Sequence, residues 1–142
     1  MTFAASPLLR AQSAPAPRTL VDIFLATVAD APQQPAIDNG SVVLTYEELA
    51  QAATDLAEAL REARVGRGPR VGIRITSGTA DLYVAILGVL VAGCAYVPVD
   101  VDDPNERART VFEEAEVAAV VGDGLTISVR QTQSAPDLST EP

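Results

Sequence analysis

The chain alternates between segments whose hydrophobic residues recur at helical spacing and short hydrophobic runs typical of strands. The first helical pattern follows Thr19, a residue type that caps helix N-termini, and ends at Pro32 and Pro35. Its hydrophobic positions are Leu20, Ile23, Phe24 and Val28. The sequence thus predicts that a helix opens the folded part of the chain.

A β-hairpin is expected next. Two short hydrophobic runs, residues 36–38 and 42–44, are separated by Asn39-Gly40-Ser41. Asn and Gly both tolerate positive φ, which tight hairpin turns require. The two runs should therefore pair as short antiparallel strands.

A second helix is expected directly after the hairpin. Thr45 and Glu48 have the spacing of a capping box, in which the Thr45 hydroxyl accepts from the Glu48 amide and the Glu48 side chain reaches back. The helix should end near Ala63, before the loop at residues 66–69. Its hydrophobic stripe consists of Leu49, Ala52, Ala53, Leu56 and Leu60.

From residue 70 onwards the pattern is β-α-β-α-β with short connections, which is typical of parallel strands joined by right-handed crossovers. The expected strands are residues 70–75, 95–99 and 117–121. The expected helices are residues 80–92, which end at Gly93 as the C′ residue, and a segment that starts with Pro104 at position N1 and carries Ala108, Val111, Phe112 and Ala115.

A last short strand, residues 125–129, is expected after the Asp123-Gly124 turn. The fold class is therefore α/β: a parallel-sheet segment preceded by a helix and a short hairpin. Three parallel strands are few for such a sheet, which indicates that the sheet is completed elsewhere. An unpaired edge and an uncovered apolar face favour marginal stability and self-association.

The two ends of the chain lack this periodicity. Residues 1–17 are rich in Ala, Pro and Ser and residues 130–142 are polar, so we expect a disordered lead-in and a polar tail around a folded part at residues 18–129. No secretory signal is evident, and the longest apolar run, residues 82–91, is too short to span a bilayer. We therefore expect a cytoplasmic protein that does not enter a membrane.

Composition and net charge exclude several classes of function for this chain. The chain has 142 residues, of which 48% are hydrophobic, and this is enough for one domain with a hydrophobic core. Its net charge of −9 argues against nucleic-acid binding. All ten basic residues are Arg, there is no His, and there is one Cys. These absences exclude a P-loop lysine, a Ser-His-Asp triad, an imidazole metal site and an internal disulfide within this chain.

Two glycine-containing loops could be mistaken for phosphate sites. Ser77-Gly78-Thr79 lies between an expected strand and helix, where backbone N–H groups can hold a phosphate. The full P-loop pattern is absent, so a turn with a helix cap is the favoured interpretation. Gly66-Arg67-Gly68 precedes a strand rather than following one, so we interpret it as a flexible connection.

The remaining candidates also have structural explanations. Asp100, Asp102 and Asp103 could bind a hard cation, but acidic residues are common at helix N-termini and no EF-hand pattern is present. Cys94 follows a helix C-terminus, a setting that favours a packed, unreactive thiol. Glu113, Glu114 and Glu116 form a solvated face. The sequence therefore assigns no catalytic, cofactor-binding or metal-binding residue to this chain.

Two segments together carry a family resemblance. LTYEEL at residues 44–49 resembles the first core motif of adenylate-forming enzymes, specifically the amino-acid adenylation domains of nonribosomal peptide synthetases, and LVAGCAYVPVD at residues 90–100 resembles their second core motif. Residues 77–108 are also similar to the synthetases that make poly-lysine-like polymers. Thr45 and Glu48 match the first motif, and the matches to the second are Gly93, Tyr96, Pro98 and Asp100. Two residues depart from the family pattern: Cys94 stands where a small Ala or Gly is usual, and Pro69 where an Asp is common.

The resemblance covers about residues 18–129 and implies the first quarter of an adenylation domain. Such domains convert an amino acid and ATP, with Mg²⁺, into an aminoacyl adenylate and pyrophosphate. They then pass the aminoacyl group to the phosphopantetheine thiol of a carrier protein. The family's phosphate loop with its Lys, amino-acid pocket, ribose-binding Asp and catalytic Lys would all follow this segment, so the chain by itself should bind no cofactor and be inactive.

The resemblance thus implies two partners, the remainder of the adenylation domain and a carrier protein. A second hypothesis is a stand-alone binding or assembly half-domain that docks a synthetase or a carrier protein. A third is a small nucleotide-binding protein that uses residues 77–79.

Overall fold

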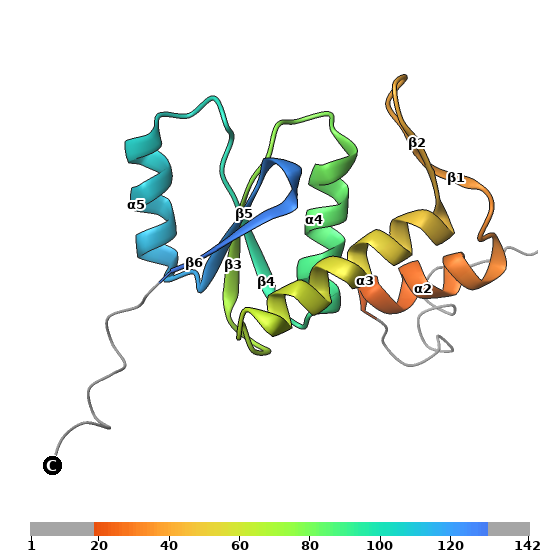
Figure 1. Ribbon diagram of the computed structural model, residues 1–142, viewed down its shortest axis with the longest axis horizontal. Coiled ribbons are helices and arrows are strands. Elements are labelled where there is room, and N and C mark those ends of the chain that lie inside the picture. The colour runs from red at the N-terminus through yellow and green to blue at the C-terminus, as the bar shows by residue number, and fades with distance from the viewer. Residues whose placement is uncertain (1–18, 131–142) are drawn as a thin grey trace, which may run out of the picture.

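The computed structural model describes residues 19–130, and these form an α/β fold around one mixed sheet (Figure 1). The sequence-based expectations for residues 1–17 and 131–142 lie outside the described residues. The central sheet has the strand order β4-β3-β5-β6. Its strands are β3 (Arg70–Arg74), β4 (Ala95–Pro98), β5 (Ala119–Gly122) and β6 (Thr126–Val129).

The expected β-α-β-α-β order and parallel pairing are confirmed. Strand β3 pairs in parallel with β4 on one side and with β5 on the other. The connections are α4 (Ala80–Val91) and α5 (Asn105–Ala115). Strand β6 adds an antiparallel edge to β5, and the ladder continues to Arg130, whose N–H donates to the Ala118 carbonyl at 2.9 Å.

Helix α2 (Leu20–Asp30) and the hairpin, made of β1 (Pro35–Asp38) and β2 (Val43–Thr45), precede the sheet and lie to one side of it (Figure 1). Both capping predictions are confirmed. The hydroxyl of Thr19 accepts from Asp22 N at 3.0 Å, and that of Thr45 accepts from Glu48 N at 3.1 Å at the start of α3 (Tyr46–Glu62).

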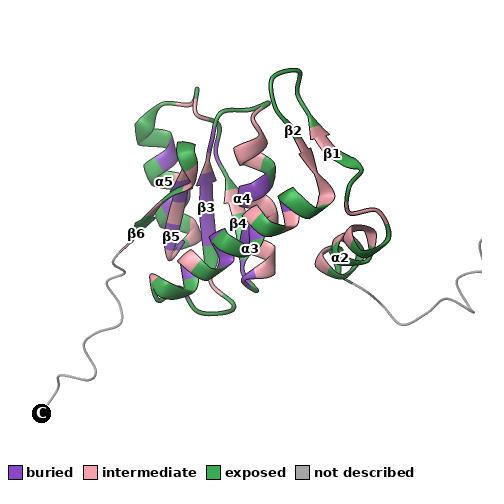
Figure 2. Cartoon of the chain, turned by 45° about the vertical axis from the view of Figure 1, so that its right-hand side comes forward, coloured by how far each residue is buried: buried purple, intermediate pink, exposed green. Residues whose placement is uncertain are grey.

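The core occupies the two faces of β3 (Figure 2). On one face Val71, Ile73 and Ile75 pack with α3 and α4 in the larger cluster of buried side chains. On the other face lies a smaller cluster that includes Phe112 of α5. Gly72 leaves room for the Phe112 ring, because a Cβ built on Gly72 would lie 2.5 Å from Phe112 Cε1.

Several expected boundaries shift by one or two residues. Pro104 is the N-cap of α5 rather than its N1 residue, so the helix begins at Asn105. A short 3-10 turn at Asp123–Leu125 delays the last strand to Thr126. Helix α5 ends at Glu116 in the left-handed conformation (φ 55°) without a glycine. Shifts of this size are common at the ends of helices and strands, where the last turn frays.

Candidate functional site

The carboxyl ends of the parallel strands are the first place to look for a site, because ligands of open α/β sheets bind where the strand order reverses. Here that point lies between β3 and β5. At this point the Asp123 carboxylate accepts from Thr76 N at 2.9 Å and from the Thr76 hydroxyl at 3.3 Å. Thr76 N, a backbone donor that a phosphate at this point would need, is thus already bonded to the Asp123 carboxylate.

The structure supports a turn at Ser77-Gly78-Thr79. Gly78 has φ +81°, and its carbonyl accepts from Asn39 Nδ2 at 3.0 Å, which fastens the loop to the hairpin. One detail of the cap interpretation is wrong. Thr79 is the N-cap of α4 but its hydroxyl donates to the Thr76 carbonyl at 2.7 Å and accepts no helix N–H.

Two side chains of the acidic cluster after β4 make contacts within the loop that leads into α5 and with the first turn of that helix. The Asp100 carboxylate accepts from Asp102 N at 2.9 Å, and the Asp103 carboxylate pairs with Arg107 at 3.3 Å. The expectation that these residues cap α5 is wrong, because the N-cap is Pro104 and no side chain caps that end. Within residues 19–130 no group of three or more His, Cys, Asp or Glu side chains is placed to hold a metal ion.

Sequence reasoning missed the residue that organises this loop, Arg74. Its guanidinium donates to the carbonyls of Asp100, Val101 and Asp103 and, at 2.8 Å, to Asn105 Oδ1. Five N–H donors in a planar fork suit such a set of converging oxygens. The signal in the sequence is an arginine at the end of a strand whose three central residues are uncharged, where a charge needs partners.

The second motif and the glycine loop before β3 are in contact. Gly68 N donates to the Gly93 carbonyl at 3.0 Å, and the Cys94 thiol donates to the Gly66 carbonyl at 3.2 Å. The sequence predicts a flexible connection at residues 66–68, but these bonds tether it. Gly93 takes φ +84° after α4, as predicted for a C′ residue. Burial raises the pKa of the Cys94 thiol, which agrees with a packed, unreactive side chain.

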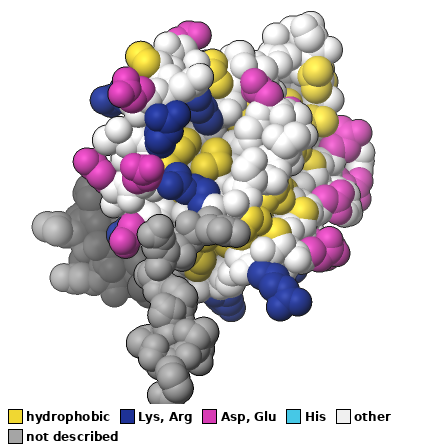
Figure 3. All heavy atoms as spheres, turned by 60° about the vertical axis from the view of Figure 1, so that its left-hand side comes forward, with side chains coloured by type: hydrophobic (Ala, Val, Ile, Leu, Met, Phe, Trp, Pro, Cys, Tyr) yellow, Lys and Arg dark blue, Asp and Glu magenta, His cyan; other side chains and the backbone are white. Residues whose placement is uncertain are grey.

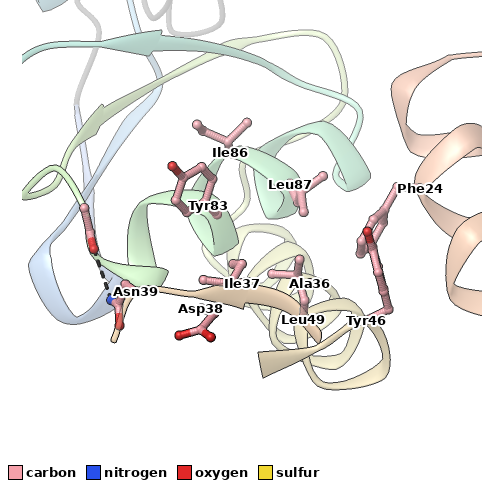
Figure 4. A pocket seen from close by; sticks show the side chains of 11 residues that line it. Phe24, Ala36, Ile37, Asp38, Asn39, Tyr46, Leu49, Tyr83, Ile86 and Leu87 are labelled. Carbon is pink, nitrogen blue, oxygen red and sulfur yellow. Dashed lines mark hydrogen bonds between the residues drawn. The ribbon is translucent and has the colours of Figure 1, made fainter. Parts of the chain in front are cut away.

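A groove lies between α2, the hairpin, α3 and α4, with a volume of about 560 Å³ (Figure 4). Its walls are mainly apolar, and Phe24 faces Tyr46 with ring centroids 6.4 Å apart. Asp38 and Asn39 supply polar groups at the rim, but both already bond to the hairpin turn: Asp38 accepts from Gly40 N, and Asn39 Oδ1 from Ser41 N and Val42 N. The residues that line the groove include no serine, cysteine, lysine or histidine.

The geometry therefore defines an α/β scaffold with an apolar groove between α2, the hairpin, α3 and α4. The chain belongs to the AMP-binding enzyme family, which matches residues 24–141. This confirms the family that the two sequence motifs indicate. No helix in the described part is long and apolar enough to cross a membrane.

Relatives and solved structures agree with this family. Syringomycin synthase SyrB1 of Pseudomonas syringae pv. syringae is 33% identical over 108 residues, which are 76% of this chain and 17% of the relative. Gramicidin S synthase 1 of Brevibacillus brevis is 35% identical over 102 residues, 72% of this chain and 9% of the relative. The chain thus spans less than a fifth of the length of these relatives.

Two structural neighbours are informative. The N-terminal subdomain of Klebsiella oxytoca NpsA, solved with 3-hydroxyanthranilyl-AMSN, has a TM-score of 0.70 at 25% identity, over 75% of this chain and 27% of that one. The nonribosomal peptide synthetase FmoA3, solved with alpha-methyl-L-serine-AMP, has a TM-score of 0.70 at 34% identity, over 76% of this chain and 12% of that one. NpsA is also solved as a longer chain, so this subdomain is one part of a larger structure.

Proposed function

We propose that this chain forms the N-terminal part of an amino-acid-adenylating ligase of nonribosomal peptide synthesis. The complete enzyme would convert an amino acid and ATP, with Mg²⁺, into aminoacyl-AMP and pyrophosphate. It would then transfer the aminoacyl group to the phosphopantetheine thiol of a carrier protein. The observation that carries the proposal is the match to the AMP-binding enzyme family over residues 24–141. Because that chemistry uses ATP, we place the enzyme in the cytoplasm.

In this proposal the chain contributes scaffold and no chemistry. The first motif forms the capping box that starts α3, and the second motif ends α4 and leads into β4. At the point where the strand order reverses, Thr76 N donates to the Asp123 carboxylate. Binding of ATP, Mg²⁺ and the amino acid is therefore assigned to the remainder of the adenylation domain.

The test is ATP–pyrophosphate exchange with two samples. The 142-residue chain alone should give no exchange above a protein-free blank. A chimera in which the chain replaces the matching segment of FmoA3 should give exchange with the amino acid that FmoA3 activates. Exchange by the chain alone would contradict the proposal, and so would an inactive chimera that is folded.

We also propose that the isolated chain self-associates through its sheet edges. Among the described residues β4 pairs only with β3, and Ala95, Tyr96 and Pro98 are exposed and uncharged. Pro98 has no N–H to offer a further strand, so pairing along this edge would be short and reversible. Sedimentation should show a concentration-dependent oligomer, and a strictly monomeric, sharply melting chain would contradict this.

A further inference from the structure

Apart from Asp81 in its first turn, helix α4 carries no charged residue and has no polar side. Its buried residues, Val84, Ala85, Gly88 and Val89, face the core. At 100° per residue, the opposite side consists of Tyr83, an aromatic residue with one hydroxyl, and of the apolar residues Ile86, Leu87 and Leu90. A helix that is hydrophobic all round is normally buried on all sides. Yet Tyr83 is 49% exposed.

Two hollows follow one another along this outer side of α4. The first is the 560 Å³ groove, which Tyr83, Ile86 and Leu87 line. The second, of about 430 Å³, is lined by Leu90 and by residues of α2 and the loop before β3. Helix α2 contributes to both hollows and carries exposed apolar side chains of its own, Leu20, Ile23 and Leu25.

The other two helices of the described part present charged outer surfaces. The exposed positions of α3 include Glu47, Asp55, Glu58 and Arg61, and those of α5 include Glu106, Arg107, Arg109, Glu113 and Glu114. Figure 3 brings forward the side of the molecule that carries α5 in Figure 1. There, acidic and arginine side chains border a strip of hydrophobic side chains. Such charged helix surfaces are suited to water, so an additional protein layer would pack on the side of α4 and α2.

The structural neighbours indicate what that layer is. The match accounts for 27% of the NpsA N-terminal subdomain, so nearly three-quarters of that subdomain lies outside the matched part. We propose that the outer side of α4, together with α2 and the hairpin, is the surface on which the remaining part of an adenylation subdomain packs. This rests on the proposed function and adds to it the surface through which the partner is held.

The test is thiol labelling of single cysteines introduced into a Cys94→Ala background. Tyr83→Cys and Ile23→Cys report on the proposed surface, and Glu58→Cys and Glu113→Cys are matched controls on the charged helix surfaces. In the isolated chain, at low concentration, all four should react with a maleimide at similar rates. In the FmoA3 chimera the first two should slow by at least about tenfold while the controls keep their rates.

Equal rates at all four positions in the chimera would overturn the inference. Protection of Tyr83→Cys in the isolated chain, accompanied by a dimer in sedimentation, would also overturn it, because a second copy would then cover the surface. Pyrophosphate exchange separates the two proposals: a protected but inactive chimera contradicts the proposed function, and an active but unprotected chimera contradicts only this inference. If the chimera is insoluble, cysteines at the matching positions of FmoA3 itself give the same reading, and free labelling there overturns the inference.

Discussion

The Asp123 carboxylate holds Thr76 by its backbone N–H and by its hydroxyl, across the point where the sheet reverses its strand order. The two residues are 47 positions apart and follow the neighbouring strands β5 and β3. The contact joins the loop before α4 to the turn before β6. It links the carboxyl ends of two neighbouring strands of the sheet.

We therefore expect Asp123→Ala to destabilise the fold by about 1 kcal/mol, since one charge-assisted and one weaker hydrogen bond are lost from an exposed position. Urea unfolding followed by circular dichroism measures the change. Asp102→Ala is the control, because the Asp102 side chain is exposed and makes no hydrogen bond in the described structure. Equal midpoints for the two variants would show that the Asp123 contact contributes nothing.

A second prediction concerns the close packing of α4 on α3. Gly→Ala inside a helix normally stabilises by about 1 kcal/mol. At Gly88 a Cβ would lie 2.7 Å from Leu56 Cδ2 and 3.1 Å from the Ala53 carbonyl oxygen, and overpacking of this kind costs about 1–3 kcal/mol. The clash should exceed the propensity gain, so Gly88→Ala should lower the melting temperature.

The matched control for Gly88→Ala is Gly66→Ala, where a Cβ would meet nothing within 4 Å. Its melting temperature should stay close to that of the wild-type chain. The packing argument fails if Gly88→Ala melts at or above the temperature of the control.

Local signals predicted much of this fold. The capping boxes at Thr19 and Thr45 and the Asn39-Gly40 turn each depend on residues within four positions of one another, so the sequence contains the complete interaction. The partners of Arg74 are 26 to 31 positions away, and those of Asp123 are 47 positions away. Such contacts exist only after the strands pair, which is why sequence reasoning assigned the acidic loop to helix capping and missed both residues.

The Arg74 contacts lead to a third prediction. Lysine keeps the positive charge of Arg74 but not the planar fork, so Arg74→Lys cannot reach three carbonyls and Asn105 Oδ1 at once. We expect a loss of about 1–3 kcal/mol and faster amide hydrogen exchange at residues 100–105. Arg109→Lys, at an exposed position of α5, should change neither. Unchanged exchange in Arg74→Lys would mean that the loop is ordered without the guanidinium fork.

The last prediction concerns Cys94, which is only 6% exposed and donates to the Gly66 carbonyl. Burial raises the pKa of its thiol, while a backbone hydrogen bond from Gly68 lowers it by less. The unfolded chain therefore releases the thiol proton at lower pH than the folded chain does. The free energy of unfolding should thus be unaffected well below the usual thiol pKa and should fall as the pH rises through it. Urea unfolding from pH 7 to pH 10 measures this fall, which should be smaller in Cys94→Ala.

Native Cys94 should also react with iodoacetamide at least about tenfold more slowly than the same thiol in urea. An equal alkaline loss of stability in both chains, or rapid labelling of the folded protein, would show that burial does not control this thiol.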